Sequence, residues 1–238
     1  MKTNDNKSDW LDSIKTNFKH HPKFYGFLVN VISHVYSSSK NNSYNKLMPL
    51  LNDKNPLIIN IGSGPFRLEM NSINVDISRY NNVDIIADAR NLPIKTNSVD
   101  AIINIAILEH IDEAEKVMGE MYRVLKVGGF IYTAIPFIYE YHASPHDYKR
   151  WTVSGCEYMH RKFNKIEIGV LSGPSSALVG VLIEWLAIIF SFGSIKIYKA
   201  LYFFFMLILW PLKYFDVLLN RHPMAKIIAC TFYYVGKK

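Results

Sequence analysis

Histidine and aspartate gather in one short polar stretch of the chain, EYHASPHDYKRWT at residues 140–152. His142 and His146 are separated by three residues, and Asp147 follows directly. An imidazole titrates near neutral pH and can take a proton from a reacting hydroxyl, while a carboxylate can orient the ring. We therefore predict His142 or His146 as a general base, with Asp147 as its partner.

The residues beside this group suit an acceptor molecule. Arg150 could hold an anionic group through its guanidinium, and Tyr148 and Trp151 are close to it in the sequence. These three are the predicted acceptor-binding residues. The alternative is that His146, Asp147 and Arg150 only brace the loop through hydrogen bonds, as such networks commonly do.

A metal ion is not expected in this stretch. His142 and His146 have an H-x-x-x-H spacing that could suit one, but Pro145 breaks the helix that such a pair prefers, and no third ligand is evident nearby. His110, in LEHID, is an alternative base at the end of a predicted strand. A capping or packing role explains His110 equally well.

A second group of residues could bind a ligand through the backbone. Gly62 and Gly64 follow the apolar run LIINI, where a turn would bring backbone N–H groups and a helix N-terminus toward a ligand. A dinucleotide site needs a third glycine at position 67, and Arg67 stands there instead. A nicotinamide or flavin cofactor is therefore disfavoured.

Two aspartates complete this second candidate site. Asp76 lies in INVDI and can accept hydrogen bonds from ribose hydroxyls, and Asp88 ends VDIIAD and can accept from an exocyclic amino group such as that of adenine. A glycine turn and two carboxylates at successive strand ends predict a site for an adenine nucleoside without phosphates. The alternative is a structural turn and two solvated aspartates.

The elements that must position these residues alternate between strand-like and helical patterns. Such alternation predicts an α/β fold, a parallel sheet with helices on its faces, and these sheets bind ligands beyond the carboxyl ends of their strands. Helices are expected over 21–36, 44–51 and 113–129, the last ended by Gly128 and Gly129. The expected strands are 57–61, 73–77, 83–88, 100–106, 130–137 and 165–171.

The sequence resembles the class I S-adenosylmethionine-dependent methyltransferases over residues 56–171. The resemblance rests on IINIGSGP, NVDIS, ADARNLPIKTNSVDAIINIAILEHI and YRVLKVGGFIYTAIPF. It implies S-adenosyl-L-methionine as cofactor and a doubly wound, seven-stranded, mostly parallel sheet of the Rossmann-like methyltransferase fold. Residues 227–238 would form its last, antiparallel strand.

Matching positions imply the cofactor contacts. The glycine turn would wrap the methionine and ribose portions, and the two aspartates would contact ribose and adenine. The chain departs from the resembled pattern in two places: Asn60 stands where an acid is usual, and the connection after Gly64 is too short for the usual first helix. The implied cofactor-binding residues are Asn60, Gly62, Ser63, Gly64, Asp76, Ile77, Asp88, Ala89 and Ala106.

The resembled core does not need the long hydrophobic insert at 174–222. Its two apolar runs, 177–193 and 200–212, are short for membrane-spanning helices, and Glu184 lies near the centre of the first. We expect a helical hairpin that dips into one leaflet, and the alternative is a buried helical pair or a dimer interface. The residues expected at the headgroup level are Trp185, Trp210, Tyr198, Tyr202 and the flanking lysines, among them Lys196, Lys199 and Lys213.

The expected organisation therefore has four parts. An N-terminal helical segment (1–55) precedes the cofactor-binding core (56–173), which is followed by the hydrophobic insert (174–222) and a C-terminal strand (223–238) that completes the sheet. The polar N-terminus lacks the apolar stretch of a secretory signal, so we expect a cytoplasmic protein that is peripheral on the inner face of the membrane.

Composition narrows the function classes further. The net charge of +7 is not gathered into an Arg-rich helix or a basic–aromatic stripe in the first two-thirds of the chain, so nucleic acid is not an expected partner. Two distant cysteines, Cys156 and Cys230, are expected to be reduced thiols. The stretch "H…PHDY.R.T" is similar to one in a methyltransferase subgroup associated with bacterial surface-glycan genes.

These observations together predict an O-methyltransferase whose acceptor is a glycan or its lipid-linked precursor at the membrane surface. Two alternatives stay open. One is methylation of a lipid or quinone delivered by the insert, and the other is a non-catalytic scaffold or binding protein that retains the fold.

Overall fold

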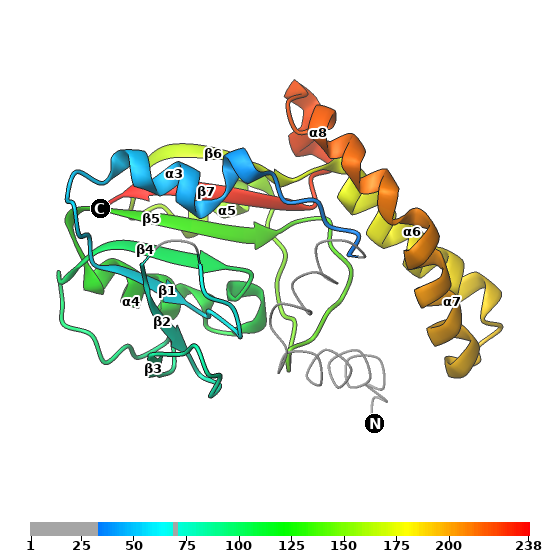
Figure 1. Cartoon of the computed structure of the whole chain (residues 1–238), viewed down its shortest axis with the longest axis horizontal. Coiled ribbons are helices and arrows are strands. Elements are labelled where there is room, and N and C mark those ends of the chain that lie inside the picture. The colour runs from blue at the N-terminus through cyan, green and yellow to red at the C-terminus, as the bar shows by residue number, and fades with distance from the viewer. Residues whose placement is uncertain (1–32, 69–70) are drawn as a thin grey trace.

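The structure is a computed structural model that describes residues 33–68 and 71–238. One seven-stranded sheet, in the order β3-β2-β1-β4-β5-β7-β6, organises the chain (Figure 1). Strands β1 to β5 are parallel along the sheet, and β7 is antiparallel to both of its neighbours. The predicted doubly wound methyltransferase-like sheet is thus confirmed. The strands are β1 (Ile58–Ile61), β2 (Ile73–Asp76), β3 (Ile85–Ile86), β4 (Val99–Ile105), β5 (Leu125–Pro136), β6 (Asn164–Ser172) and β7 (Thr231–Lys237).

Alternate residues of the buried strands point to opposite faces of the sheet, and each face has its own core. Ile102 packs on the side of helices α4 (Ala114–Val124) and α5 (Val153–Met159). Its neighbour Ile103 packs on the other side with Leu47, which belongs to the short helix α3 (Ser43–Leu47). The 3-10 turns η1 (Ser39–Asn41) and η2 (Met48–Leu50) flank α3.

The helix expected over 113–129 is shorter than predicted, and this is a correction. It ends at Val124, and β5 begins at Leu125, whose backbone is extended and pairs with Val99. Gly128 adopts a positive φ of 84° within this strand, and its N–H donates to the carbonyl of Lys238 at 3.0 Å. The glycine pair therefore belongs to the strand and does not cap the helix.

The connection between β1 and β2 is short, as expected. No helix occurs among its described residues, 62–68 and 71–72.

Strand β3 is also shorter than predicted. The N-terminal helix predicted over 21–36 lies mostly outside the described residues, and residues 33–36, which are described, are not helical. The helix predicted over 44–51 is α3 followed by the tighter turn η2, which begins at Met48 and contains Pro49.

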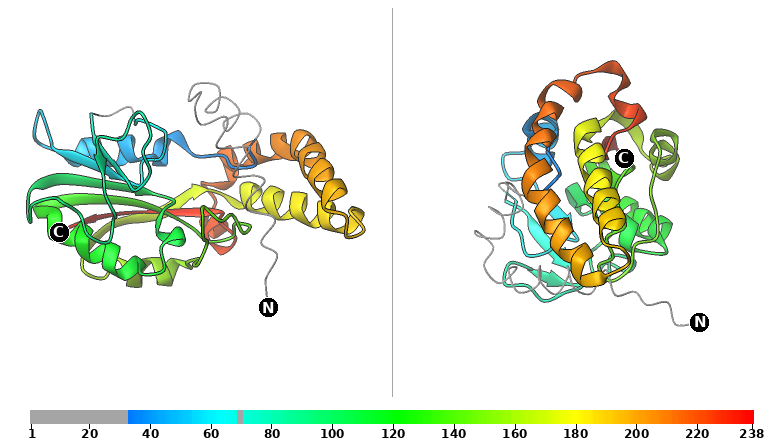
Figure 2. Two further views of the ribbon diagram at one scale, coloured as in Figure 1. Left: turned by 90° about the horizontal axis from the view of Figure 1, so that it is seen from below. Right: turned by 90° about the vertical axis from the view of Figure 1, so that its right-hand side faces the viewer.

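The hydrophobic insert forms a helical hairpin between β6 and β7. Helices α6 (Pro174–Phe190) and α7 (Ile195–Leu209) lie side by side and extend away from the sheet (Figures 1 and 2). The chain returns through η4 (Trp210–Phe215), α8 (Asp216–Leu219) and η5 (Pro223–Ile227). The buried carboxylate of Asp216 accepts hydrogen bonds from the N–H groups of Gly173, Ser175 and Ser176, so it caps the start of α6.

Candidate active site

The glycine turn follows β1 and needs its glycines. Gly62 and Gly64 have positive φ angles of 72° and 57°. A Cβ on Gly62 would collide with the side chain of Ile107, so the turn packs directly against the segment that follows β4. A Cβ on Gly64 would meet no atom within 4 Å, which leaves open space beside its backbone. Such an open, side-chain-free turn fits a cofactor that approaches the backbone.

Asp76 closes this turn at the end of β2. Its Oδ2 accepts the N–H of Gly64 at 2.8 Å, and its Oδ1 accepts the N–H of Ser78 at 2.8 Å. Each carboxylate oxygen has two lone pairs, so both retain one for a further donor such as a ribose hydroxyl. The structure thus brings Gly64 and Asp76 together, as a nucleoside site requires.

Asp88 lies after β3 and is held by Arg90. The guanidinium donates from Nε and Nη2 to its carboxylate at 2.8–3.1 Å, and these bonds hold the pKa of Asp88 below its usual value. Ala89 is buried beside it, whereas the side chain of Ile77 is exposed. Arg90 therefore fixes the orientation of the carboxylate predicted to contact adenine.

Asn60 lies inside the sheet. It is buried in β1, and its Nδ2 donates to Oδ1 of Asn74 at 3.3 Å. Ser63 is also buried, with its hydroxyl donating to the carbonyl of Gly64 at 3.3 Å. In this arrangement both side chains brace β1 and its turn.

A strained alanine directs the chain after β4. Ala106 has a positive φ of 53°, which is unfavourable for a residue with a Cβ, and its N–H is held by the carbonyl of Ala134 at 2.9 Å. The 3-10 turn η3 (Leu108–His110) follows at once. The left-handed residue thus turns Glu109 and His110 into the region at the carboxyl ends of β4 and β5.

Glu109 is a candidate that the sequence analysis did not include among its catalytic residues. Its side chain is fully buried, and neither carboxylate oxygen has a hydrogen-bond partner within the described part of the chain. Burial raises the pKa of this carboxyl to about 8. A sequence signal existed, because Glu109 is adjacent to His110 at a predicted strand end, but its burial depends on the loop after β5.

Arg150 braces that loop. Its five N–H donors all meet acceptors of the loop: the carbonyls of Tyr139, Glu140 and Lys149 and both oxygens of the buried Asp147. The arrangement favours the bracing alternative over an acceptor clamp for Arg150. Asp147 is beside His142 as predicted, because its Oδ2 accepts the N–H of His142 at 2.8 Å and lies 3.5 Å from Nδ1 of that ring. Trp151 is buried in the core beneath the loop, and the exposed Tyr148 donates its N–H to the carbonyl of Glu109 at 2.7 Å.

Of the two histidines predicted as alternative bases, His142 is the one that meets Glu109 and His110. The Nε2 of His142 lies 3.9 Å from Oε1 of Glu109, and the His142 and His110 rings are edge to face at 5.1 Å. His146 contributes its carbonyl, which accepts from Nδ1 of His110 at 2.6 Å, while its ring lies against Tyr148. Burial lowers the pKa of His142 to about 4, so its ring is neutral at neutral pH.

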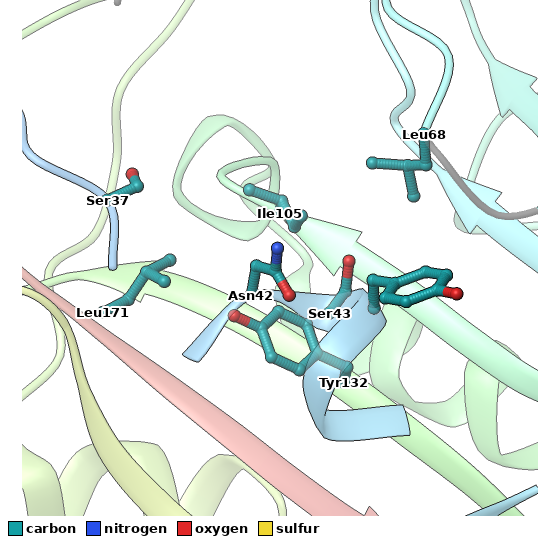
Figure 3. Close-up of a pocket in the computed structure, with 8 residues that line it drawn as sticks. Ser37, Asn42, Ser43, Leu68, Ile105, Tyr132 and Leu171 are labelled. Carbon is teal, nitrogen blue, oxygen red and sulfur yellow. The ribbon is translucent and has the colours of Figure 1, made fainter. Parts of the chain in front are cut away.

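Figure 3 shows a separate pocket on the α3 side of the sheet, with a volume of about 180 Å³. Its walls are mostly apolar, and Ile105 at the end of β4 is the neighbour in sequence of Ala106. None of the predicted site residues lines it. The lining residues are Ser37, Asn42, Ser43, Tyr44, Leu68, Ile105, Tyr132 and Leu171.

Comparison with known proteins supports the prediction of a methyltransferase fold. Residues 66–133 match the family model described as "Methyltransferase domain". No curated protein sequence matches the chain. A SAM-dependent methyltransferase from Archaeoglobus fulgidus is similar in structure, with a TM-score of 0.51, 14% identity and coverage of 90% of this chain and 99% of that one.

Two further solved structures have a similar fold. The [4+2]-cyclase SpnF has a TM-score of 0.54 and 14% identity, covering 94% of each chain. Phosphoethanolamine N-methyltransferase 2 of Haemonchus contortus, solved with S-adenosyl-L-methionine, has a TM-score of 0.50 and 16% identity, covering 94% of this chain and 60% of that one. At these identities the likeness shows the fold, and the matched domain confirms the expected enzyme class.

Proposed function

We propose that this S-adenosylmethionine-dependent methyltransferase methylates a hydroxyl of a glycan, or of a lipid-linked glycan precursor, at a membrane surface. The observation that carries the proposal is the convergence of Glu109, His110 and His142 where β4 and β5 end. This acid–histidine group is joined to the cofactor turn through Ile107, against which Gly62 packs. A hydroxyl acceptor needs such a group, because its proton must leave as the new O–C bond forms.

S-adenosylmethionine supplies a methyl group that is already activated for transfer. The residues of this chain that fit it are the open turn at Gly62 and Gly64 and the carboxylate of Asp76, with Asp88 and Ala89 beside the predicted adenine position. These groups position the donor, and positioning is the main catalytic demand in a displacement.

The acceptor's proton has two candidate recipients. The Nδ1 of His142 donates to the carbonyl of Glu140 at 3.0 Å, so Nε2 of the neutral ring carries the lone pair and is directed at the Glu109 side. Glu109 is the second recipient in its carboxylate form, which predominates above its pKa of about 8. The Arg150–Asp147 pair holds the loop in place while this proton moves.

The surface of the hairpin supports the membrane part of the proposal. The helical run Ile195–Leu219 is 25 residues long with a hydropathy of 1.6 over its most apolar window, which makes it the one described helix long and apolar enough to cross a membrane. Only 11% of that window is buried. Large apolar side chains exposed on the hairpin include Leu178, Trp185, Ile188, Phe192, Ile195, Phe204, Leu207 and Ile208.

Two charged residues of the insert, Lys213 and Glu184, are buried in the structure. Lys213 is 1% exposed, and its Nζ donates to the carbonyl of Ser33 at 2.7 Å, so its assignment to the headgroup level is wrong. Glu184 is buried between the helices and accepts the hydroxyl of Tyr198 at 2.6 Å. The acid in the middle of the first apolar run therefore faces protein, which removes an objection to contact between the hairpin's outer face and lipid.

The pocket of Figure 3 favours one second candidate, methylation of a lipid or quinone. Its apolar walls suit a hydrocarbon part of an acceptor, and Ile105 at the end of β4 is one of its lining residues. A glycan precursor that carries a lipid would use the same walls for its lipid part. The two candidates differ in whether the methylated atom belongs to a sugar.

The deciding experiment follows the methyl group. Purified protein is incubated with S-adenosylmethionine labelled in its methyl group and with membrane extracts that contain lipid-linked glycans, and the labelled product is treated with mild acid. Label released in a sugar fragment supports the glycan proposal. Label retained in the lipid fraction overturns it in favour of the second candidate, and Glu109→Gln with His142→Gln should abolish labelling in either case.

A further inference from the structure

We propose that Glu109, His110 and His142 form a binding site for one divalent first-row transition-metal ion. Each residue offers one ligand atom, and these atoms all lie within 4.8 Å of one another. They come from η3 after β4 and from the loop after β5, so the site exists only when the two strands are paired. The inference concerns metal binding itself and does not depend on the identity of the acceptor.

The imidazoles are oriented as metal ligands usually are. Nδ1 of His110 bonds the carbonyl of His146 at 2.6 Å, and Nδ1 of His142 bonds the carbonyl of Glu140 at 3.0 Å. A carbonyl only accepts, so each Nδ1 carries a proton, and Nε2 is the nitrogen of each ring that is left to bind a metal ion. A hydrogen bond from the second ring nitrogen to a carbonyl is the common support of a metal-bound histidine.

Glu109 gives an independent reason to place a cation here. Its carboxyl is fully buried, yet neither oxygen has a hydrogen-bond partner within residues 33–68 and 71–238. A buried carboxylate without a hydrogen bond or a counter-charge is unfavourable. The guanidinium of Arg150 attracts this carboxylate but does not hydrogen-bond to it, because its donors are committed to the loop. A metal ion would supply the missing partner.

The donor set indicates the class of metal. Two imidazoles and one carboxylate suit zinc and its first-row neighbours, whereas magnesium and calcium prefer oxygen ligands. Ligand bonds of roughly 2.0–2.2 Å place ligand atoms up to roughly 4 Å apart, so small side-chain rotations would close this site. Three protein ligands leave an open position, where the hydroxyl of the proposed acceptor could bind and lose its proton more easily. With the ion bound, Glu109 and Nε2 of His142 would act as its ligands and would no longer take the proton themselves.

This inference departs from our expectation that no metal is held by this region. The H-x-x-x-H spacing of His142 and His146 pointed to the wrong partner, since His146 supports the site through its carbonyl and turns its ring toward Tyr148. The spacing could not identify the other two ligands, Glu109 and His110, because they are distant from His142 in the sequence.

Metal titration of the full-length, tag-free chain tests the inference. Protein stripped with a chelator is titrated with Co²⁺, followed by its visible absorption, and with Zn²⁺, followed by calorimetry. We expect one ion per chain. Glu109→Gln and His142→Ala should each weaken binding by at least about 100-fold, because loss of a ligand exceeds the roughly 10–100-fold effect of losing a supporting residue. His146→Ala is the matched control, since it removes an imidazole from the same loop, keeps the supporting carbonyl and should bind metal like the wild type.

Thermal unfolding separates lost binding from lost folding. Zn²⁺ should raise the Tm of the wild type and of His146→Ala, and leave the Tm of folded Glu109→Gln unchanged. The inference is overturned if the folded wild type binds neither ion, or if Glu109→Gln and His142→Ala bind as tightly as His146→Ala. Binding of S-adenosylmethionine is measured in parallel, so failure of the cofactor proposal and failure of the metal site are distinct results.

Discussion

At the scale of single residues, two positions with positive φ shape the site. Gly62 is the first residue after β1 and packs against Ile107. Ala106 is the first residue after β4, and its left-handed backbone conformation costs a residue with a Cβ about 1 kcal/mol or more. Both stand at the carboxyl ends of neighbouring strands, where ligands bind in this kind of sheet. Backbone strain at Ala106 therefore coincides with a residue that is predicted to bind the cofactor.

Asp76 gives the sharpest test of the cofactor position. Asp76→Ala should weaken S-adenosylmethionine binding by roughly 10–100-fold, because hydrogen bonds to a charged group contribute about 1.5–3 kcal/mol. Calorimetric titration measures the change. Asp53→Ala, which removes an exposed carboxylate in the segment before β1, is the control and should bind S-adenosylmethionine like the wild type. Equal affinities for the two variants would mean that the cofactor lies elsewhere.

A buried histidine outside the site predicts how stability depends on pH. His160 is fully buried, its ring nitrogens contact the carbonyl of Cys156 and the hydroxyl of Thr133 at 2.7 Å, and burial lowers its pKa from 6.5 to about 4. Between these pH values the unfolded chain holds a proton on His160 that the folded chain does not. Stability is therefore lost as the pH falls from 6.5 toward 4, by about 3 kcal/mol from this group.

Chemical denaturation at several pH values checks this prediction. His160→Gln, which can still donate and accept a hydrogen bond but does not titrate, should be less stable at pH 7 and lose less stability on acidification than the wild type. Other titrating groups, His142 among them, are common to both proteins and cancel in the comparison. If the free energy of unfolding fell with pH in the same way for both proteins, the prediction that His160 is buried and neutral would be contradicted.

At the scale of elements, the hairpin is held at its base and exposed along its length. Asp216 binds three N–H groups at the start of α6, and Tyr198 joins Glu184 across the helices. Helix α7 has no buried residue. A large exposed apolar surface, such as the one that this hairpin presents, is typical of an interaction surface.

We expect this surface to bind lipid. The wild type should float with vesicles that contain anionic lipid, and the double variant Trp185→Asp with Phe192→Asp should bind at least about tenfold more weakly, since burying one large apolar side chain contributes about 1.5–3 kcal/mol. Val127→Asp is the control, because Val127 is as exposed as Phe192 (82% and 89%) but lies at the start of β5, away from the hairpin.

The same experiment has an outcome that contradicts lipid binding. If both variants float like the wild type, or if none of the proteins binds vesicles, the hairpin does not contact lipid. A wild type that is dimeric without vesicles, and monomeric after the Trp185 and Phe192 changes, would identify the hairpin as the dimer interface instead.

At the scale of the whole molecule, the candidate site and the hairpin share one side. Strands β4 and β5 point toward the side from which α6 and α7 extend (Figure 1). A hairpin resting in a membrane surface would thus hold the carboxyl edge of the sheet near that surface. This arrangement suits an acceptor that carries a lipid.

The sequence by itself determined the sheet, the glycine turn and the aspartate that closes it. These features depend on local patterns, because apolar strand runs, glycines with positive φ and a carboxylate at a strand end are each read from a few adjacent residues. The insert was predictable for the same reason. Two consecutive apolar helices are visible in any window that contains them.

Only the tertiary structure decided which side chains meet. Glu109 and His142 are distant in the sequence and become neighbours because β4 pairs with β5, and burial then changes the charge state that each prefers. Lys213 was predicted at the headgroup level from its position at the end of an apolar run, but it folds back onto the carbonyl of Ser33. Spacing along the chain reports only local geometry, whereas contact, burial and pKa depend on elements that the fold brings together from far apart.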